Sequence, residues 1–166
     1  MKWKILLENP EDIAKFRGID LDPKPPTFKL SFTKAKKIID KAIKNEEKIV
    51  VYGDYDVDGI CATAIIWEAL NKMGAKVLPF IPKRENEGYG LSKAGIDNID
   101  AKLIITVDSG IVAHEAIDYA HSKGIKVIVI DHHEKPKKLS KADAIIHTTE
   151  LCSAGIAYFV SLLLCH

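Results

Sequence analysis

The chain has 166 residues, 47% hydrophobic and 28% charged, which is ordinary for a soluble globular domain. Its net charge of +1 does not indicate a strongly basic nucleic-acid-binding protein, although a local basic patch stays open. No signal peptide is recognisable, and no apolar run approaches the roughly 18 residues that a membrane span needs. These features favour one cytoplasmic α/β domain with a substantial core and no membrane attachment.

Residues 1–32 form an irregular lead-in in this interpretation, because the segment DPKPPTFKL contains three prolines. The next segment, KAKKIIDKAIKNEE, carries apolar residues at a spacing that places them on one face of a helix. We therefore assign residues 33–166 to the folded domain.

From residue 48 onward, short β-branched segments alternate with helical patterns. The segments KIVVY, AKVLPFIP, KLIITV and IKVIVI predict strands, and ADAIIH is a candidate fifth. Helices are predicted over residues 59–74, from Ser92, over 112–124 and over 153–164. This alternation predicts a parallel sheet of about five strands with helices on both faces.

The three cysteines are odd in number and show no CxxC spacing. We expect buried, reduced thiols rather than a disulfide or a zinc site at Cys61, Cys152 and Cys165.

Charged side chains directly follow three of the predicted strands. They are Asp54, Asp56 and Asp58 after the first strand, Asp108 after the third, and Asp131, His132 and His133 after the fourth. Ligands bind at the carboxyl ends of strands in such sheets, and neighbouring strands lie about 5 Å apart. The three clusters converge if their strands are neighbours or next-neighbours.

Converging carboxylates need positive charge, yet no lysine or arginine occurs between residues 49 and 71. Carboxylate oxygens with an imidazole nitrogen suit a divalent ion such as Mn²⁺, whereas Mg²⁺ prefers oxygen ligands alone and Zn²⁺ favours thiolates. Two ions about 3.5–4 Å apart could share a carboxylate and activate a water for phosphoester hydrolysis.

Simpler interpretations remain beside this one. An aspartate after a strand often caps the next helix, which is an alternative for Asp108 and a weaker one for the triplet. His132 and His133 could form a surface pair. We expect His114, His121 and His147 to be ordinary surface or helix residues.

Three segments, YGDYDVDG, IITVDSGI and VIDHHE, occur in this order and resemble the motifs of the DHH phosphoesterases. The similarity is strongest to the RecJ-like branch of single-stranded-DNA exonucleases, whose further segments resemble IPKRENEGYGLS and ELCSAGIAYF. The resemblance implies the DHH phosphoesterase fold and a hydrolase that removes nucleotides from single-stranded DNA in the 5′ to 3′ direction. It also implies Mn²⁺ or Mg²⁺ as cofactor, with two ions in the complete site.

The resemblance also implies roles for individual residues. The implied metal ligands are Asp54, Asp56, Asp58, Asp108 and His132. Asp108 would bridge the ions, His133 would face the scissile phosphate, and Asp131 would orient the histidines as a supporting carboxylate. Many relatives carry a histidine where this chain has Tyr52, which we interpret as a variation within the branch.

Three residues of the polar segment after the second strand are candidates for substrate binding. Lys83 and Arg84 could hold phosphate, and Tyr89 could stack on a base. The alternative is a solvated loop in which Tyr89 packs locally.

Two expectations follow from the family pattern beyond the first three motifs. The family's fourth metal-binding aspartate would lie beyond the AGIAYF segment, and the smaller C-terminal DHH-associated domain has no counterpart in the sequence. The chain is therefore a fragment or a domain that has lost part of its machinery in this interpretation. We expect it to bind at least one divalent ion and to hydrolyse single-stranded DNA poorly.

Adjacent residues of an extended chain point to opposite sides, so we expect different roles for His132 and His133. His132 would bind metal, whereas His133 would act in cleavage.

Two other functions stay open. One is hydrolysis of oligoribonucleotides or cyclic dinucleotides by an enzyme of the same superfamily. The other is a non-catalytic scaffold for replication proteins. Single-stranded DNA is the expected partner, with replication or repair proteins as further candidates, and the sequence does not fix the oligomeric state.

Overall fold

The computed structural model describes residues 31–83 and 90–165, so most of the predicted lead-in lies outside the described residues, as do Arg84 and Tyr89. Five strands form one sheet in the order β2-β1-β3-β4-β5, and every neighbouring pair is parallel. The strands are β1 (Ile49–Tyr52), β2 (Val77–Phe80), β3 (Leu103–Val107), β4 (Lys126–Asp131) and β5 (Ala144–His147). The predicted parallel sheet is confirmed, including its candidate fifth strand.

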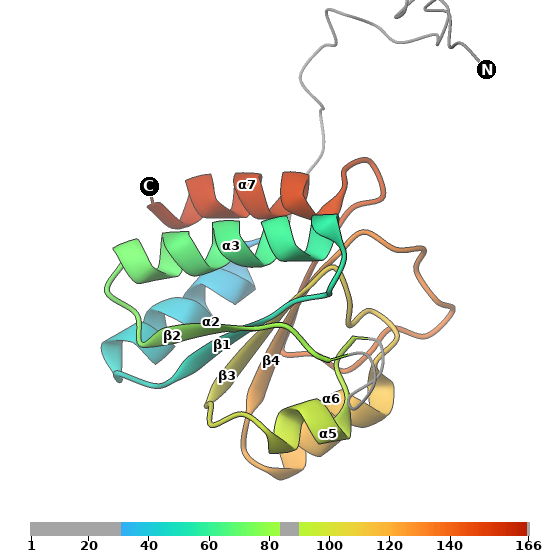
Figure 1. Cartoon of the computed structure of the whole chain (residues 1–166), viewed down its shortest axis with the longest axis horizontal. Coiled ribbons are helices and arrows are strands. Elements are labelled where there is room, and N and C mark those ends of the chain that lie inside the picture. The colour runs from blue at the N-terminus through green and yellow to red at the C-terminus, as the bar shows by residue number, and fades with distance from the viewer. Residues whose placement is uncertain (1–30, 84–89, 166) are drawn as a thin grey trace, which may run out of the picture.

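Helices cover both faces of the sheet, as predicted (Figure 1). They are α2 (Thr33–Lys44), α3 (Val57–Lys72) and α7 (Ser153–Cys165) on one face, and α5 (Lys93–Asp97) and α6 (His114–Ser122) on the other. Strand β1 shows how one short segment serves two cores: Val51 packs toward α3, whereas Val50 and Tyr52 belong to the core under α5 and α6. Burial of alternate residues on both faces explains why the strands are apolar throughout.

Helices α3 and α7 lie side by side over the sheet, although their sequences are about 80 residues apart (Figure 1). Ile66 and Leu70 of α3 share one core with Ile156 and Val160 of α7. This packing places the beginnings of both helices near the carboxyl ends of the strands.

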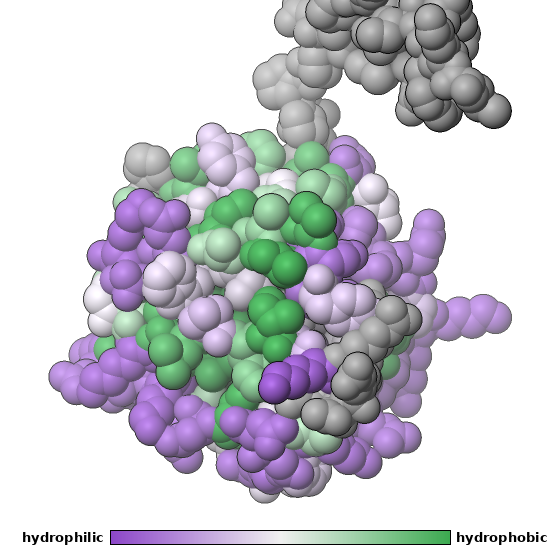
Figure 2. Space-filling model, viewed as in Figure 1, coloured by the Kyte–Doolittle hydropathy of each residue, from purple (hydrophilic) through white to green (hydrophobic). Residues whose placement is uncertain are grey.

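Strand β2 forms one edge of the sheet. Pro79 is tolerated there because a proline in an edge strand need not donate a ladder hydrogen bond. Leu78 is 70% exposed, and Figure 2 shows apolar side chains gathered on the face that α3 and β2 present, with hydrophilic side chains around them.

All three cysteines are free thiols, and all three are exposed. The expectation that they are buried is therefore wrong. Cys152 precedes α7, and Cys165 is its last residue, where the helix faces solvent. Among the described residues, no helix combines the length and the apolar character needed to cross a bilayer.

Candidate metal centre

The sheet order makes β1, β3 and β4 neighbours, so the three charged strand ends converge. Tyr52 at the end of β1 pairs with Thr106, and Val107 at the end of β3 pairs with Ile130. The acidic segment after β1 therefore lies beside Asp108, which in turn lies beside the histidine pair after β4. This adjacency is the condition that the sequence interpretation required.

Asp54 and Asp56 occupy the turn from β1 into α3. Asp54 is only 1% exposed, and its Oδ1 accepts a hydrogen bond from the Tyr55 backbone at 2.7 Å. Asp56 is exposed and caps α3, because its Oδ1 accepts from the Gly59 backbone N–H at 2.9 Å. A β-carbon at Gly59 would lie 2.6 Å from Cβ of Asp54, so this glycine lets the helix begin directly against the buried carboxylate.

Asp108 follows β3 in an unusual backbone conformation. Its φ is +61°, in the left-handed region that residues other than glycine, asparagine and aspartate seldom adopt. The side chain is 2% exposed. Helix α6 begins at His114 with Ala113 as its N-cap, so the alternative in which Asp108 only caps that helix is wrong. A buried carboxylate in this uncommon conformation and outside any cap is typical of a functional position.

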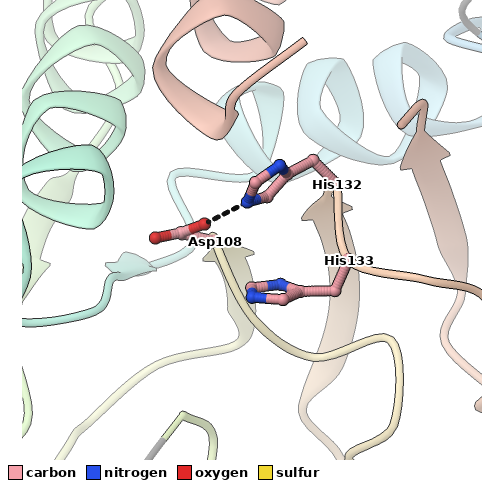
Figure 3. Close-up of side chains that lie close together, drawn as sticks. All are labelled: Asp108, His132 and His133. Atoms are coloured by element: carbon pink, nitrogen blue, oxygen red, sulfur yellow. Dashed lines mark ion pairs between the residues drawn. The ribbon is translucent and has the colours of Figure 1, made fainter. Parts of the chain in front are cut away.

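His132 lies directly over this carboxylate. Its Nε2 is 3.3 Å from Oδ1 of Asp108 and 3.8 Å from Oδ2 of Asp58, as Figure 3 shows for Asp108. The ring centroids of His132 and His133 are only 4.7 Å apart. The expectation that they point to opposite sides is wrong, because β4 ends at Asp131 and the alternation of an extended strand does not continue beyond it.

Asp131 is hydrogen-bonded to the second histidine. Its Oδ1 is 2.7 Å from Nδ1 of His133 and accepts from the backbone N–H groups of both histidines, while its Oδ2 accepts from the Ile111 backbone at 2.9 Å. Burial lowers the pKa of His133, but the hydrogen bond to Asp131 and the negative charges around it outweigh that effect. The pKa of His133 is therefore raised.

Among the residues that the structure describes, two groups of side chains each have ligand atoms that lie within 4.8 Å of one another: Asp54, Asp56 and Asp108; and Asp108, His132 and His133. Asp108 belongs to both groups, as a bridging ligand would. Burial, followed by the charges of Asp58 and Asp56, raises its pKa to about 6 despite the hydrogen bond that Asp108 accepts from Ser153. Oxygen donors that repel one another, with imidazole nitrogen beside them, fit one or two divalent ions of the manganese type.

Asp58 makes contacts that sequence reasoning missed. Its Oδ2 accepts a hydrogen bond from the Ser153 backbone at 2.8 Å and its Oδ1 from the Ala154 backbone at 2.7 Å. Ser153 is fully buried, and its Oγ donates to Oδ1 of Asp108 at 2.8 Å. The only sequence signal was a serine at the beginning of a predicted helix, which ordinarily indicates nothing more than a cap.

Three other residues considered in the sequence analysis lie outside the two groups of candidate ligands. Lys83 is exposed, three residues beyond β2. Tyr52 is fully buried under α5, with its ring 5.0 Å from that of Phe80, so it is a core residue. His147 also differs from the expected ordinary surface residue, because its Nε2 lies 2.7 Å from the backbone oxygen of His133 and supports the histidine pair from β5.

Known proteins resemble this chain in sequence and in fold. The single-stranded-DNA-specific exonuclease RecJ of Bacillus subtilis (strain 168) is 39% identical over 132 residues, 72% of this chain and 17% of that protein. A crystal structure of exonuclease RecJ bound to manganese covers 86% of this chain and 39% of its own, with a TM-score of 0.74 at 33% identity. RecJ of Thermus thermophilus in complex with Mn²⁺ covers 92% of this chain and 24% of its own, with a TM-score of 0.69 at 32% identity.

The chain spans between 17% and 25% of the length of three curated RecJ relatives. The sequence model described as "DHH family, N-terminal domain" matches residues 48–164. That match includes all three charged strand ends and both histidines of the last motif. The chain therefore belongs to the DHH family, whose N-terminal domain it contains.

Proposed function

We propose that this chain is the metal-binding part of a phosphodiesterase that removes nucleotides from single-stranded DNA in the 5′ to 3′ direction. The proposal rests mainly on the convergence of Asp54, Asp56 and Asp108 with His132 at the carboxyl ends of the strands. Within each of the two groups of side chains, the ligand atoms lie within 4.8 Å of one another. The relatives that share this region are named as single-stranded-DNA-specific exonucleases, which supports the choice of substrate.

The proposed metal ligands are Asp54, Asp56, Asp108 and His132, with Asp58 at the edge of the site. Bound divalent ions would supply activation of the attacking water and neutralisation of charge on the phosphate. The protein holds Asp108 between the two groups of side chains, and its buried position keeps bulk water from screening its charge.

His133 is the proposed catalytic histidine. Asp131 holds its Nδ1 at 2.7 Å, and in this proposal the ring faces the scissile phosphate. Its pKa is raised, and a protonated ring could donate a hydrogen bond to a phosphate oxygen. The proposed contacts to the DNA strand remain Lys83, Arg84 and Tyr89. Of these residues, the structure describes only Lys83, which is exposed.

The test compares substrates under identical conditions. The purified chain is incubated with Mn²⁺ and 5′-phosphorylated single-stranded DNA, a short oligoribonucleotide or a cyclic dinucleotide, and the products are resolved. Asp56→Asn is the matched control, because asparagine caps a helix as well as aspartate does and so keeps α3 intact.

We expect weak release of mononucleotides from DNA alone, lost in Asp56→Asn. Preferential cleavage of either other substrate would favour the alternative phosphodiesterase. Absence of Mn²⁺ binding in calorimetry would favour the scaffold. Rapid, processive release from DNA would show that the site is complete without a further aspartate.

A further inference from the structure

The beginning of α7 contacts the candidate metal centre through both backbone and side chain. Ser153 is the first residue of this helix and is fully buried. Its hydroxyl donates to Asp108, while its backbone N–H and that of Ala154 donate to Asp58. Two acids that are 50 residues apart in the sequence are thus held by one helical turn.

Asp108 needs such a partner because its carboxylate is otherwise free to turn. A carboxylate can rotate about its last bond at little cost. The hydroxyl of Ser153 at 2.8 Å and Nε2 of His132 at 3.3 Å both approach Oδ1. These two contacts hold Oδ1 in place and so restrict rotation of the carboxylate.

Asp58 is placed to hold α7 rather than a metal ion. Each of its oxygens accepts a short hydrogen bond from the positive end of that helix, at 2.8 and 2.7 Å. Among the described residues, Asp58 is absent from both groups whose ligand atoms lie within 4.8 Å of one another. Its position in the first turn of α3, two residues after Asp56, makes it a link between the beginnings of α3 and α7.

We propose that Ser153 is a positioning residue that sets the orientation of the Asp108 carboxylate for metal binding, and that Asp58 holds Ser153 in place by fixing the beginning of α7. The inference rests on the proposed function only in that Asp108 ligates a divalent ion. It gives the sequence motif around Ser153 a role at the metal centre rather than only in the core.

Mn²⁺ binding to the intact chain tests the proposal, with the dissociation constant from calorimetry and the spectrum of the bound ion from electron paramagnetic resonance. Ser153→Ala should weaken Mn²⁺ binding about tenfold or more, the size typical of residues that support a metal ligand, and should alter the spectrum of the bound ion. Ser161→Ala is the matched control, because Ser161 lies on the same helix and its hydroxyl donates to the Tyr158 backbone oxygen. It should leave both readouts unchanged.

A double-mutant cycle separates the role of Asp58 from direct ligation. If Asp58 acts through Ser153, adding Asp58→Asn to Ser153→Ala should weaken binding little further. Additive losses would mean that Asp58 contacts the ion itself and would overturn its proposed role. Asp58→Asn alone also tests the link if Ser153→Ala fails to fold, since it should reproduce the weakened binding and the altered spectrum.

The failure of this inference differs from that of the proposed function. If the parent chain binds Mn²⁺ and Ser153→Ala binds it equally with an unchanged spectrum, the positioning role is wrong and the metal centre stands. If the parent chain itself binds no Mn²⁺, the proposed function fails.

Discussion

Two regions of the domain hold their carboxylates in different ways. On the outer surface, acids pair with lysines: Lys36 with Asp40, Lys48 with Asp100, Lys72 with Glu68, Lys76 with Glu46, Lys93 with Glu115 and Lys123 with Asp97. At the carboxyl ends of β1, β3 and β4, the ion pairs described involve histidine, and acids lie against acids.

The pKa values of the two regions move in opposite directions. A hydrogen bond from Lys76 lowers the pKa of Glu46, whereas burial and neighbouring aspartates raise that of Asp108. The surface pairs suit a protein in water, but the strand-end cluster is unfavourable until a cation arrives. We infer from this difference that the cluster serves binding rather than stability.

The largest expected effect comes from Asp108→Asn. Asparagine has nearly the same shape and tolerates the left-handed backbone, so the fold should survive while the shared ligand is lost. We expect Mn²⁺ affinity to fall by at least about 100-fold, more than loss of a supporting residue costs. Calorimetry measures this, and the lysine-paired surface should be unaffected. Parental affinity in the variant would rule out a shared site at Asp108.

The next largest effects should distinguish the roles of the two histidines. His132→Ala removes the imidazole that lies over Asp108 and should weaken Mn²⁺ binding about tenfold or more. His133→Ala should leave Mn²⁺ largely bound but slow cleavage of single-stranded DNA by roughly 10²–10⁴-fold, the range for loss of an acid–base group. Calorimetry and a cleavage assay on both variants check the division. Equal loss of metal in both would contradict it.

A third expected effect concerns stability without metal. The pKa of Asp108 is about 6 in the folded chain, compared with an ordinary value of 3.8. Between these values the folded chain binds more protons than the unfolded chain, so the free energy of unfolding should fall as pH rises from about 4 to 6. Because two pKa units correspond to almost 3 kcal/mol, we expect a loss of about 1–3 kcal/mol.

Urea unfolding in the presence of a chelator, at a series of pH values, measures this dependence. The Asp108→Asn variant should lack the contribution of Asp108 to this pH dependence. It should be more stable than the parent at pH 7 but not at pH 4. If the free energy of unfolding depended on pH in the same way in both proteins, the charge of Asp108 would not destabilise the metal-free fold.

The smallest effect is expected on the paired surface. Lys76→Ala removes the partner of Glu46, a pair in which both side chains are more than half exposed. Solvent and salt screen such pairs, so we expect almost no change in melting temperature and none in Mn²⁺ affinity. Thermal melts at low and high salt check this. If the melting temperature fell as far as it does for a core substitution, the proposed difference between the two regions would be wrong.

Much of this arrangement could be predicted from the sequence because its signals are local. The β-branched segments and the helical spacings located every described strand and helix, and parallel order then brought Asp54, Asp108 and His132 to one edge. A strand end followed by charged residues is visible without a structure.

The roles of Ser153 and Asp58 could not be predicted in the same way. Their hydrogen bonds join residues 45 to 96 positions apart, and they depend on where α7 begins relative to α3. The opposite orientation expected for His132 and His133 failed for a related reason, since the end of β4 at Asp131 decides it. Helix ends and strand ends are the least predictable boundaries in a sequence.

The most direct test of the metal centre is anomalous X-ray diffraction at the manganese edge from crystals of this chain soaked in Mn²⁺. We predict at least one strong anomalous peak in contact with Asp108, shared with Asp54 and Asp56 or with His132. The same crystals of Asp108→Asn should show a much weaker peak. Absence of a peak at these side chains, or a peak only among the exposed acids of the outer surface, would contradict the account.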